Sequence, residues 1–173
     1  NLQWLGYRIP YSIIVLSEAA KEQYPFAVSL KETLRTYHSA NSQVAPEVEM
    51  LVAASKMNVQ KNIRNAFQKS IKWSADHLHK FVKHLSEVII SYDEKVSDVL
   101  AKHREVEHQI ECLKSSPLNY KEMKGILHDI QAIVDDMNLA EYSNMSKWTS
   151  LLGDRIEFIL LERLDVVIKD WVQ

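Results

Sequence analysis

The chain has the composition of a folded protein, and this excludes several classes. Its 173 residues are 46% hydrophobic and 25% charged with a net charge of −2, proportions at which a chain buries a core rather than staying disordered. It has one cysteine and three glycines, which exclude an internal disulfide and disfavour a sheet-rich fold. No apolar run reaches the roughly 20 residues that span a bilayer, so we expect a soluble protein without membrane insertion.

The first part of the chain is expected to be irregular and then helical. Residues 1–45 are predicted to form an irregular N-terminal segment and two short helices. The first helix turns Ile13 and Leu16 inward, and the second begins at Pro25, where the missing N–H costs little. Residues 46–173 are predicted to form an elongated helical bundle. Both parts are expected to pack together as one unit.

A single long helix is predicted over residues 76–113. Apolar or seam-facing residues recur there in steps of three and four, at Phe81, Leu85, Val88, Tyr92, Val96, Val99, His103, Val106, Ile110 and Leu113. At 1.5 Å per residue such a helix is about 57 Å long, whereas a compact globule of this chain length is roughly 40 Å across. The pattern therefore predicts an all-α fold, an elongated bundle of about five or six helices with one long central helix.

Two further helices complete the predicted bundle. Asn119 can cap the first of them, and Gly125 inside it suggests a close contact with another helix, because glycine in a helix is otherwise unfavourable. The last helix begins at about Ser146 and is predicted to turn Trp148 and Leu164 inward.

The motifs that signal catalysis or cofactor binding do not occur in the sequence. It contains no GxxxxGK[ST] or GxGxxG loop for nucleotide phosphates, no HExxH metal motif and no GxSxG nucleophile elbow. His77, His79 and His84 lie close together in sequence, but a solvated or interface face explains them better than a metal site. We therefore expect no catalytic residue, no cofactor and no metal in this chain.

Charge is unevenly distributed along the chain. Residues 51–86 hold seven basic residues and one acid, which indicates an acidic partner or, equally, neutralisation by the acidic C-terminal half. Nucleic acid is not favoured, because the basic residues occupy several helix faces without interleaved aromatics. The candidate partner-binding residues lie where charge and aromatic residues cluster, at Lys69, Lys72, Trp73, His77 and Lys80.

Several longer strings carry a family resemblance. NLQWLGYRIP opens the chain, and QYPFAVSLKETLRTY, SYDEKVSDVL, ILHDIQAIVDDMNLAEYSNMSKW and IEFILLERL follow in order. Together they resemble the N-terminal tail of the cytoplasmic dynein heavy chain, over nearly the whole sequence. The chain opens on Asn1 and closes within an apolar helical run, so we expect a piece of a longer protein.

The resemblance implies a mechanical role. The family's heavy chain is a minus-end-directed microtubule motor in the cytoplasm, and its ATP-driven AAA+ ring lies far downstream of the tail. The implied role is a rigid, non-catalytic scaffold that binds the light intermediate chain and the intermediate chain, and that meets dynactin and cargo adaptors through the assembled tail of a homodimer. The alternative from the residues alone is a helical-bundle scaffold of an unrelated tethering or coiled-coil protein.

Overall fold

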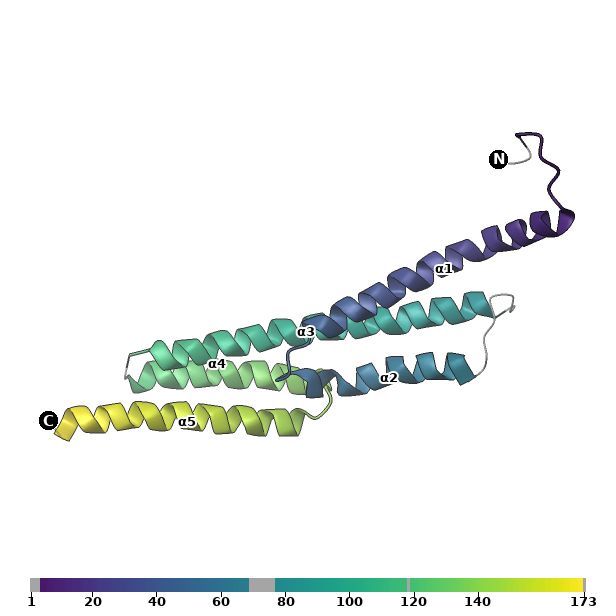
Figure 1. Ribbon diagram of the computed structural model, residues 1–173. Coiled ribbons are helices and arrows are strands. Elements are labelled where there is room, and N and C mark those ends of the chain that lie inside the picture. Colours follow the sequence, from purple (N-terminus) through teal and green to yellow (C-terminus); the bar gives the residue numbers. More distant parts are fainter. Residues whose placement is uncertain (1–3, 69–76, 118, 173) are drawn as a thin grey trace. The chain divides into compact units, whose positions relative to one another are not determined.

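Helices make up the regular structure of the chain. The computed structural model describes residues 4–68, 77–117 and 119–172, and in this part of the chain there is no strand. The described residues form α1 (Tyr11–Gln43), α2 (Glu49–Gln68), α3 (Leu78–Ser115), α4 (Tyr120–Leu139) and α5 (Met145–Val172) (Figure 1). The predicted all-α class is confirmed. None of the helices in the described residues combines the length and the apolar character that a membrane span requires.

The predicted long helix is confirmed as α3. It has 38 residues and is about 57 Å long at 1.5 Å per residue. Most of the predicted seam is its buried side, where the side chains of Tyr92, Val99 and Ile110 are at most 1% exposed. Phe81, Val88 and His103, also predicted on the seam, are only half-buried. Full burial of one such side chain contributes about 1.5–3 kcal/mol, so packing along this seam holds the helix more than intrinsic helix propensity does.

The chain divides into two compact units, and each unit takes part of α2 and part of α3. Unit 1 consists of Asn1–Ser39 and Asn58–Asp93, and unit 2 consists of Ala40–Met57 and Glu94–Gln173. The units therefore alternate along the sequence. The domain boundary predicted after residue 45 stays a prediction.

Aromatic contacts join α1 to α3 inside unit 1. The ring centroids of Tyr37 and Tyr92 lie 5.7 Å apart, and those of Phe26 and His79 lie 5.9 Å apart in an edge-on arrangement. Both separations fall in the range where ring pairs attract each other. These two contacts hold the later part of α1 along the first half of α3.

Unit 2 packs α4 and α5 with the second half of α3. Helices α4 and α5 lie side by side (Figure 1). Asn119 caps α4 as predicted, since its side-chain oxygen accepts a hydrogen bond of 3.0 Å from the Lys121 backbone N–H. The core of this unit includes Val106, Ile110, Leu113, Ile130, Val134, Met137, Trp148 and Ile159.

The connection between α4 and α5 is bonded to the first turn of α2, also within unit 2. Glu141 and Asn144 adopt positive φ angles of 53° and 55°, a conformation in which asparagine is well tolerated. The Ser143 backbone N–H then donates to the Leu51 carbonyl at 3.0 Å, and Asn144 Nδ2 donates to the Met50 carbonyl at 2.9 Å. These bonds tie the α4–α5 connection to the start of α2.

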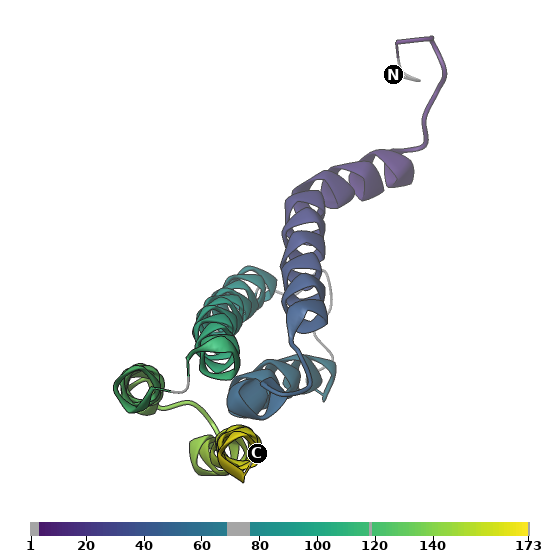
Figure 2. The ribbon, with the colours of Figure 1, turned by 90° about the vertical axis from the view of Figure 1, so that its left-hand side faces the viewer.

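The structure differs from the prediction in α1. The two short helices predicted in residues 1–45 are one helix, α1, with Pro25 inside it. An internal proline removes one backbone hydrogen bond and kinks a helix, and Figure 2 shows the first turns of α1 leaving the axis of the rest. Ile13 and Leu16, predicted to face inward, are 53% and 69% exposed. The helix continues through Pro25, and good helix formers such as Glu22 and Leu30 lie about one turn away on either side.

Two predicted contacts in unit 2 are also wrong. Among the residues that the structure describes, no atom of a neighbouring element lies within 4 Å of a Cβ built on Gly125, so no close helix contact within them explains this glycine. Leu164, predicted to face inward, is 54% exposed, although Trp148 on the same predicted face is buried. The helical period of α5 therefore does not separate its inward residues from its outward ones.

Candidate partner interface

The structure places two of the five predicted partner-binding residues. Lys69, Lys72 and Trp73 lie outside the described residues. His77 and Lys80 lie at the start of α3 in unit 1, and both are exposed to solvent. The candidate interface is therefore built from these two residues and from what surrounds them in unit 1.

One face of α3 carries the polar residues of this region. His77, Lys80 and His84 follow each other at intervals of three and four residues, which brings them onto one side of the helix. Leu78 and Val82 are at most 7% exposed and occupy the opposite side. Burial of the apolar side thus fixes the direction in which the polar face points, away from the core of unit 1.

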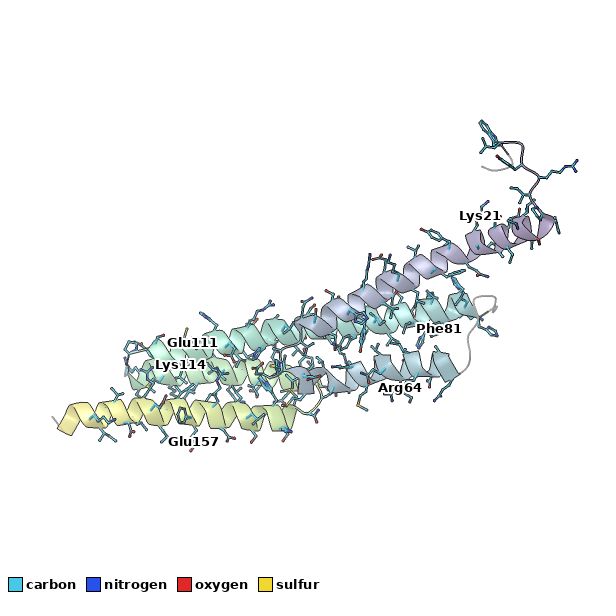
Figure 3. The ribbon with its side chains drawn as sticks, in the orientation of Figure 1. Lys21, Arg64, Phe81, Glu111, Lys114 and Glu157 are labelled. Atoms are coloured by element: carbon cyan, nitrogen blue, oxygen red, sulfur yellow. The ribbon has the colours of Figure 1, made fainter. Side chains whose placement is uncertain are left out.

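The second half of α2 adds further basic residues. Lys61 and Arg64 are exposed and lie three residues apart, so the helical period puts both on the side of α2 opposite the buried Val59. Figure 3 labels Arg64 on α2. Asn62 Oδ1 lies 3.2 Å from His84 Nε2, and this hydrogen bond links α2 to α3 within unit 1. We call the exposed basic residues of these two helices the basic surface, defined by Lys61, Arg64, His77, Lys80 and Lys83.

Carboxylates of the chain neutralise only part of the basic run. Lys56 Nζ lies 2.7 Å from Glu49 Oε1 in unit 2, and Lys83 Nζ lies 4.0 Å from Glu87 Oε1 in unit 1. Lys61, Arg64 and Lys80 form no ion pair with the residues that the structure describes. These three cations remain available to an acidic partner.

The histidines of this region have structural neighbours. His79 packs edge-on against Phe26, and His84 is hydrogen-bonded to Asn62. Within the described part of the chain, no group of three or more His, Cys, Asp or Glu side chains is arranged to hold a metal ion. The rings of His79 and His84 thus contact other side chains of unit 1.

A hollow in unit 2 has a different character. It has a volume of about 380 Å³ and is lined by residues that include His103, Trp148 and the ion pair of Glu107 with Arg155. Two hydrogen bonds of 2.5 and 2.7 Å join the guanidinium to the two carboxylate oxygens, and this contact lowers the pKa of Glu107. Both groups stay charged at neutral pH, so the pair connects α5 to α3 and does not offer a proton for catalysis.

The prediction missed the apolar side chains that the helices leave exposed. In unit 1 they include Trp4, Tyr11 and Leu16, and in unit 2 they include Phe158 and Ile168 on α5, all between 58% and 96% exposed. A signal was present in the sequence, since α5 carries apolar residues on nearly all of its sides. Contiguous exposed apolar patches are typical of interaction surfaces.

Comparison with known proteins finds that the sequence is similar to dynein heavy chains. A family model described as "Dynein heavy chain, N-terminal region 1" matches residues 1–81. The whole chain aligns at 44% identity with the cytoplasmic dynein heavy chain of Dictyostelium discoideum and at 30% with that of Drosophila melanogaster. The corresponding protein of Paramecium tetraurelia is 31% identical over 99% of the chain. The chain spans about 4% of the length of each of these relatives.

Proposed function

Because this chain belongs to the dynein heavy chain family and lies in the N-terminal region of the heavy chain, we propose that it is a non-catalytic scaffold in the tail of a minus-end-directed microtubule motor. The observation that carries the proposal is the 44% identity with a cytoplasmic dynein heavy chain along the whole chain. Long helices with continuous buried seams suit a part that transmits force and holds subunits.

The scaffold has several proposed partners. The segment binds the light intermediate chain and contributes to binding of the intermediate chain, and the assembled tail meets dynactin and cargo adaptors. The heavy chain forms a homodimer, acts in the cytoplasm on microtubules, and hydrolyses ATP in an AAA+ ring outside this segment.

The basic surface is the proposed contact for an accessory subunit. Lys61, Arg64 and Lys80 are exposed and have no ion-pair partner among the described residues. An acidic partner gains a faster encounter and a fixed orientation from such a surface. Lys69, Lys72 and Trp73 lie between these residues in sequence and remain part of the proposed contact.

Charge reversal in the heavy chain tests this contact. We expect the combined variant Lys61→Glu, Arg64→Glu and Lys80→Glu to lower the amount of light intermediate chain that co-purifies by about tenfold. The positions are exposed, so the fold should tolerate the changes. A second variant, which reverses Lys69, Lys72 and Lys80, tests the lysines predicted from the sequence in the same way.

A matched control separates a specific contact from net charge. The control reverses three exposed basic residues of unit 2, which are Lys95, Arg104 and Lys147. It changes the net charge by the same amount and should leave co-purification unchanged. If the basic-surface variants retain the light intermediate chain, or if the control loses it equally, the basic surface is not the contact.

A further inference from the structure

Helix α5 has more apolar surface than its own unit covers. Trp148, Leu152 and Ile159 are buried against the rest of unit 2. Leu161, Leu164 and Ile168 are 54–58% exposed, and their spacing of three and four residues aligns them along one side of the helix. A surface helix that packs on one side only has one apolar stripe. The second stripe of α5 therefore indicates a second packing surface.

Leu164 of this second stripe also lines a groove between α4 and α5 in unit 2. It has a volume of about 470 Å³. Its apolar lining comes from both helices, with Tyr120, Met123 and Leu127 on α4, and Leu160, Leu164 and Val167 on α5. Tyr120 is 76% exposed. Two neighbouring helices with an apolar groove between them are the geometry that receives a third, amphipathic helix.

The charged residues of the groove indicate which charge a docked helix should carry. The charged side chains in its lining are those of Lys124 and Arg163. Arg163 is already hydrogen-bonded to Leu113 and Ser116 at the end of α3. Lys124 is exposed, and among residues 4–68, 77–117 and 119–172 it has no carboxylate within ion-pair distance. The α4 side of the groove therefore favours an acidic neighbour.

From these observations we propose that the α4/α5 groove docks an amphipathic helix of another polypeptide, with its apolar stripe on Leu164 and its neighbours and an acidic edge beside Lys124. Like the helix-in-groove complexes, it takes affinity from the apolar stripe and orientation from the charged edge. The inference goes beyond the proposed function, because it concerns unit 2 and a different surface from the basic residues of unit 1.

A pair of synthetic helices tests the proposal on the chain itself. The probe is a fluorescein-labelled peptide about three heptads long, with leucine at the seam positions and glutamate beside them. The comparison peptide has the same leucines with lysine in place of glutamate. By fluorescence anisotropy we expect the acidic peptide to bind about tenfold more tightly, since Lys124 attracts its glutamates and repels the lysines of the comparison peptide.

Three variants locate the binding. Leu164→Glu should lower the affinity for the acidic peptide by about tenfold or more, because it places a charge on the apolar wall of the groove. Lys124→Glu should remove the preference for the acidic peptide and leave the fold intact, since the position is exposed. Leu139→Glu, at an 82% exposed residue of α4 outside the groove, should bind as the unaltered chain does.

Three results would overturn the proposal. The first is equal binding of the two peptides. The second is undiminished binding by both the Leu164→Glu and the Lys124→Glu variants. The third is a chain that self-associates in sedimentation equilibrium through the Leu164 surface and binds neither peptide, since the occupant would then be a second copy. Loss of peptide binding leaves co-purification of the light intermediate chain unaffected, so this test and that of the proposed function fail separately.

Discussion

Arg163 lies on α5 and donates hydrogen bonds to the C-terminal end of α3. Its replacement should therefore destabilise unit 2. The last carbonyl groups of a helix have no partner within the helix. The guanidinium of Arg163 donates to the carbonyls of Leu113 and Ser116 and also lies 3.2 Å from the Ser116 hydroxyl. Its positive charge also suits the negative end of the helix dipole. The change Arg163→Met keeps much of the length of the side chain and removes these donors.

The expected cost follows from these contacts. A hydrogen bond that involves a charged group contributes about 1.5–3 kcal/mol. The Leu113 carbonyl keeps a second donor, the Ser116 hydroxyl at 3.3 Å, which limits the loss at that end. We therefore expect the free energy of unfolding to fall by about 2–3 kcal/mol. Urea denaturation followed by far-ultraviolet circular dichroism measures this difference directly.

Two control variants separate the effect of the Arg163 hydrogen bonds from the effect of its positive charge. Arg104→Met makes the same chemical change at an exposed position of α3 and should cost less than about 0.5 kcal/mol. Arg163→Lys keeps the charge but cannot make the two-pronged contact, so its stability should lie between those of the unaltered chain and Arg163→Met. Equal stability of Arg163→Met and Arg104→Met would refute the role given to Arg163.

The sequence predicts the long helix well because the signal is local. The seam from Leu85 to Leu113 has an apolar or seam-facing residue every three or four positions, so each helical turn repeats the same pattern. The Asn119 cap is local in the same sense, since its acceptor is two residues from its donor. Pro25 shows the limit of such signals, because a proline suits the first turn of a new helix as well as a kink inside a continuous one.

Contacts between distant residues could not be predicted. Arg163 meets the end of α3 and Asn144 meets α2 at sequence separations of 47 to 94 residues, and no local pattern marks either residue. Leu164 and Ile13 are apolar and correctly spaced, and this pattern predicts an inward position for both. Period alone does not say whether an apolar face packs on its own chain or on another.

That the basic residues form a partner interface stays a prediction, and the structure shows only where some of them lie. The excess of basic residues between residues 51 and 86 is a property of composition, and the exposed Lys61, Arg64 and Lys80 agree with it. Which of the seven basic residues already have acidic neighbours depends on the fold. Lys56 belongs to an ion pair with Glu49 at 2.7 Å, and nothing in its local sequence sets it apart from Lys61.

Two more predictions concern residues of unit 2. Gly125→Ala should raise the free energy of unfolding, measured by thermal unfolding, by about 1 kcal/mol, because no neighbouring element of the described residues crowds the new methyl group. The control Gly6→Ala, at a φ of 78°, should give no such gain in that measurement. Glu107→Gln should destabilise the chain at neutral pH and lose this effect in acid. The hydrogen bonds from Arg155 lower the pKa of Glu107 in the folded chain, so the unfolded chain binds the proton more readily and the carboxylate stabilises the folded state. That contribution is complete above the ordinary glutamate pKa of about 4.3 and is lost as the pH falls through the lower pKa of the folded state. Urea titrations of both proteins from neutral pH to below pH 4 should therefore show their stabilities converging at the acid end, and a difference that stays constant with pH would mean that the Glu107 charge is not what holds Arg155.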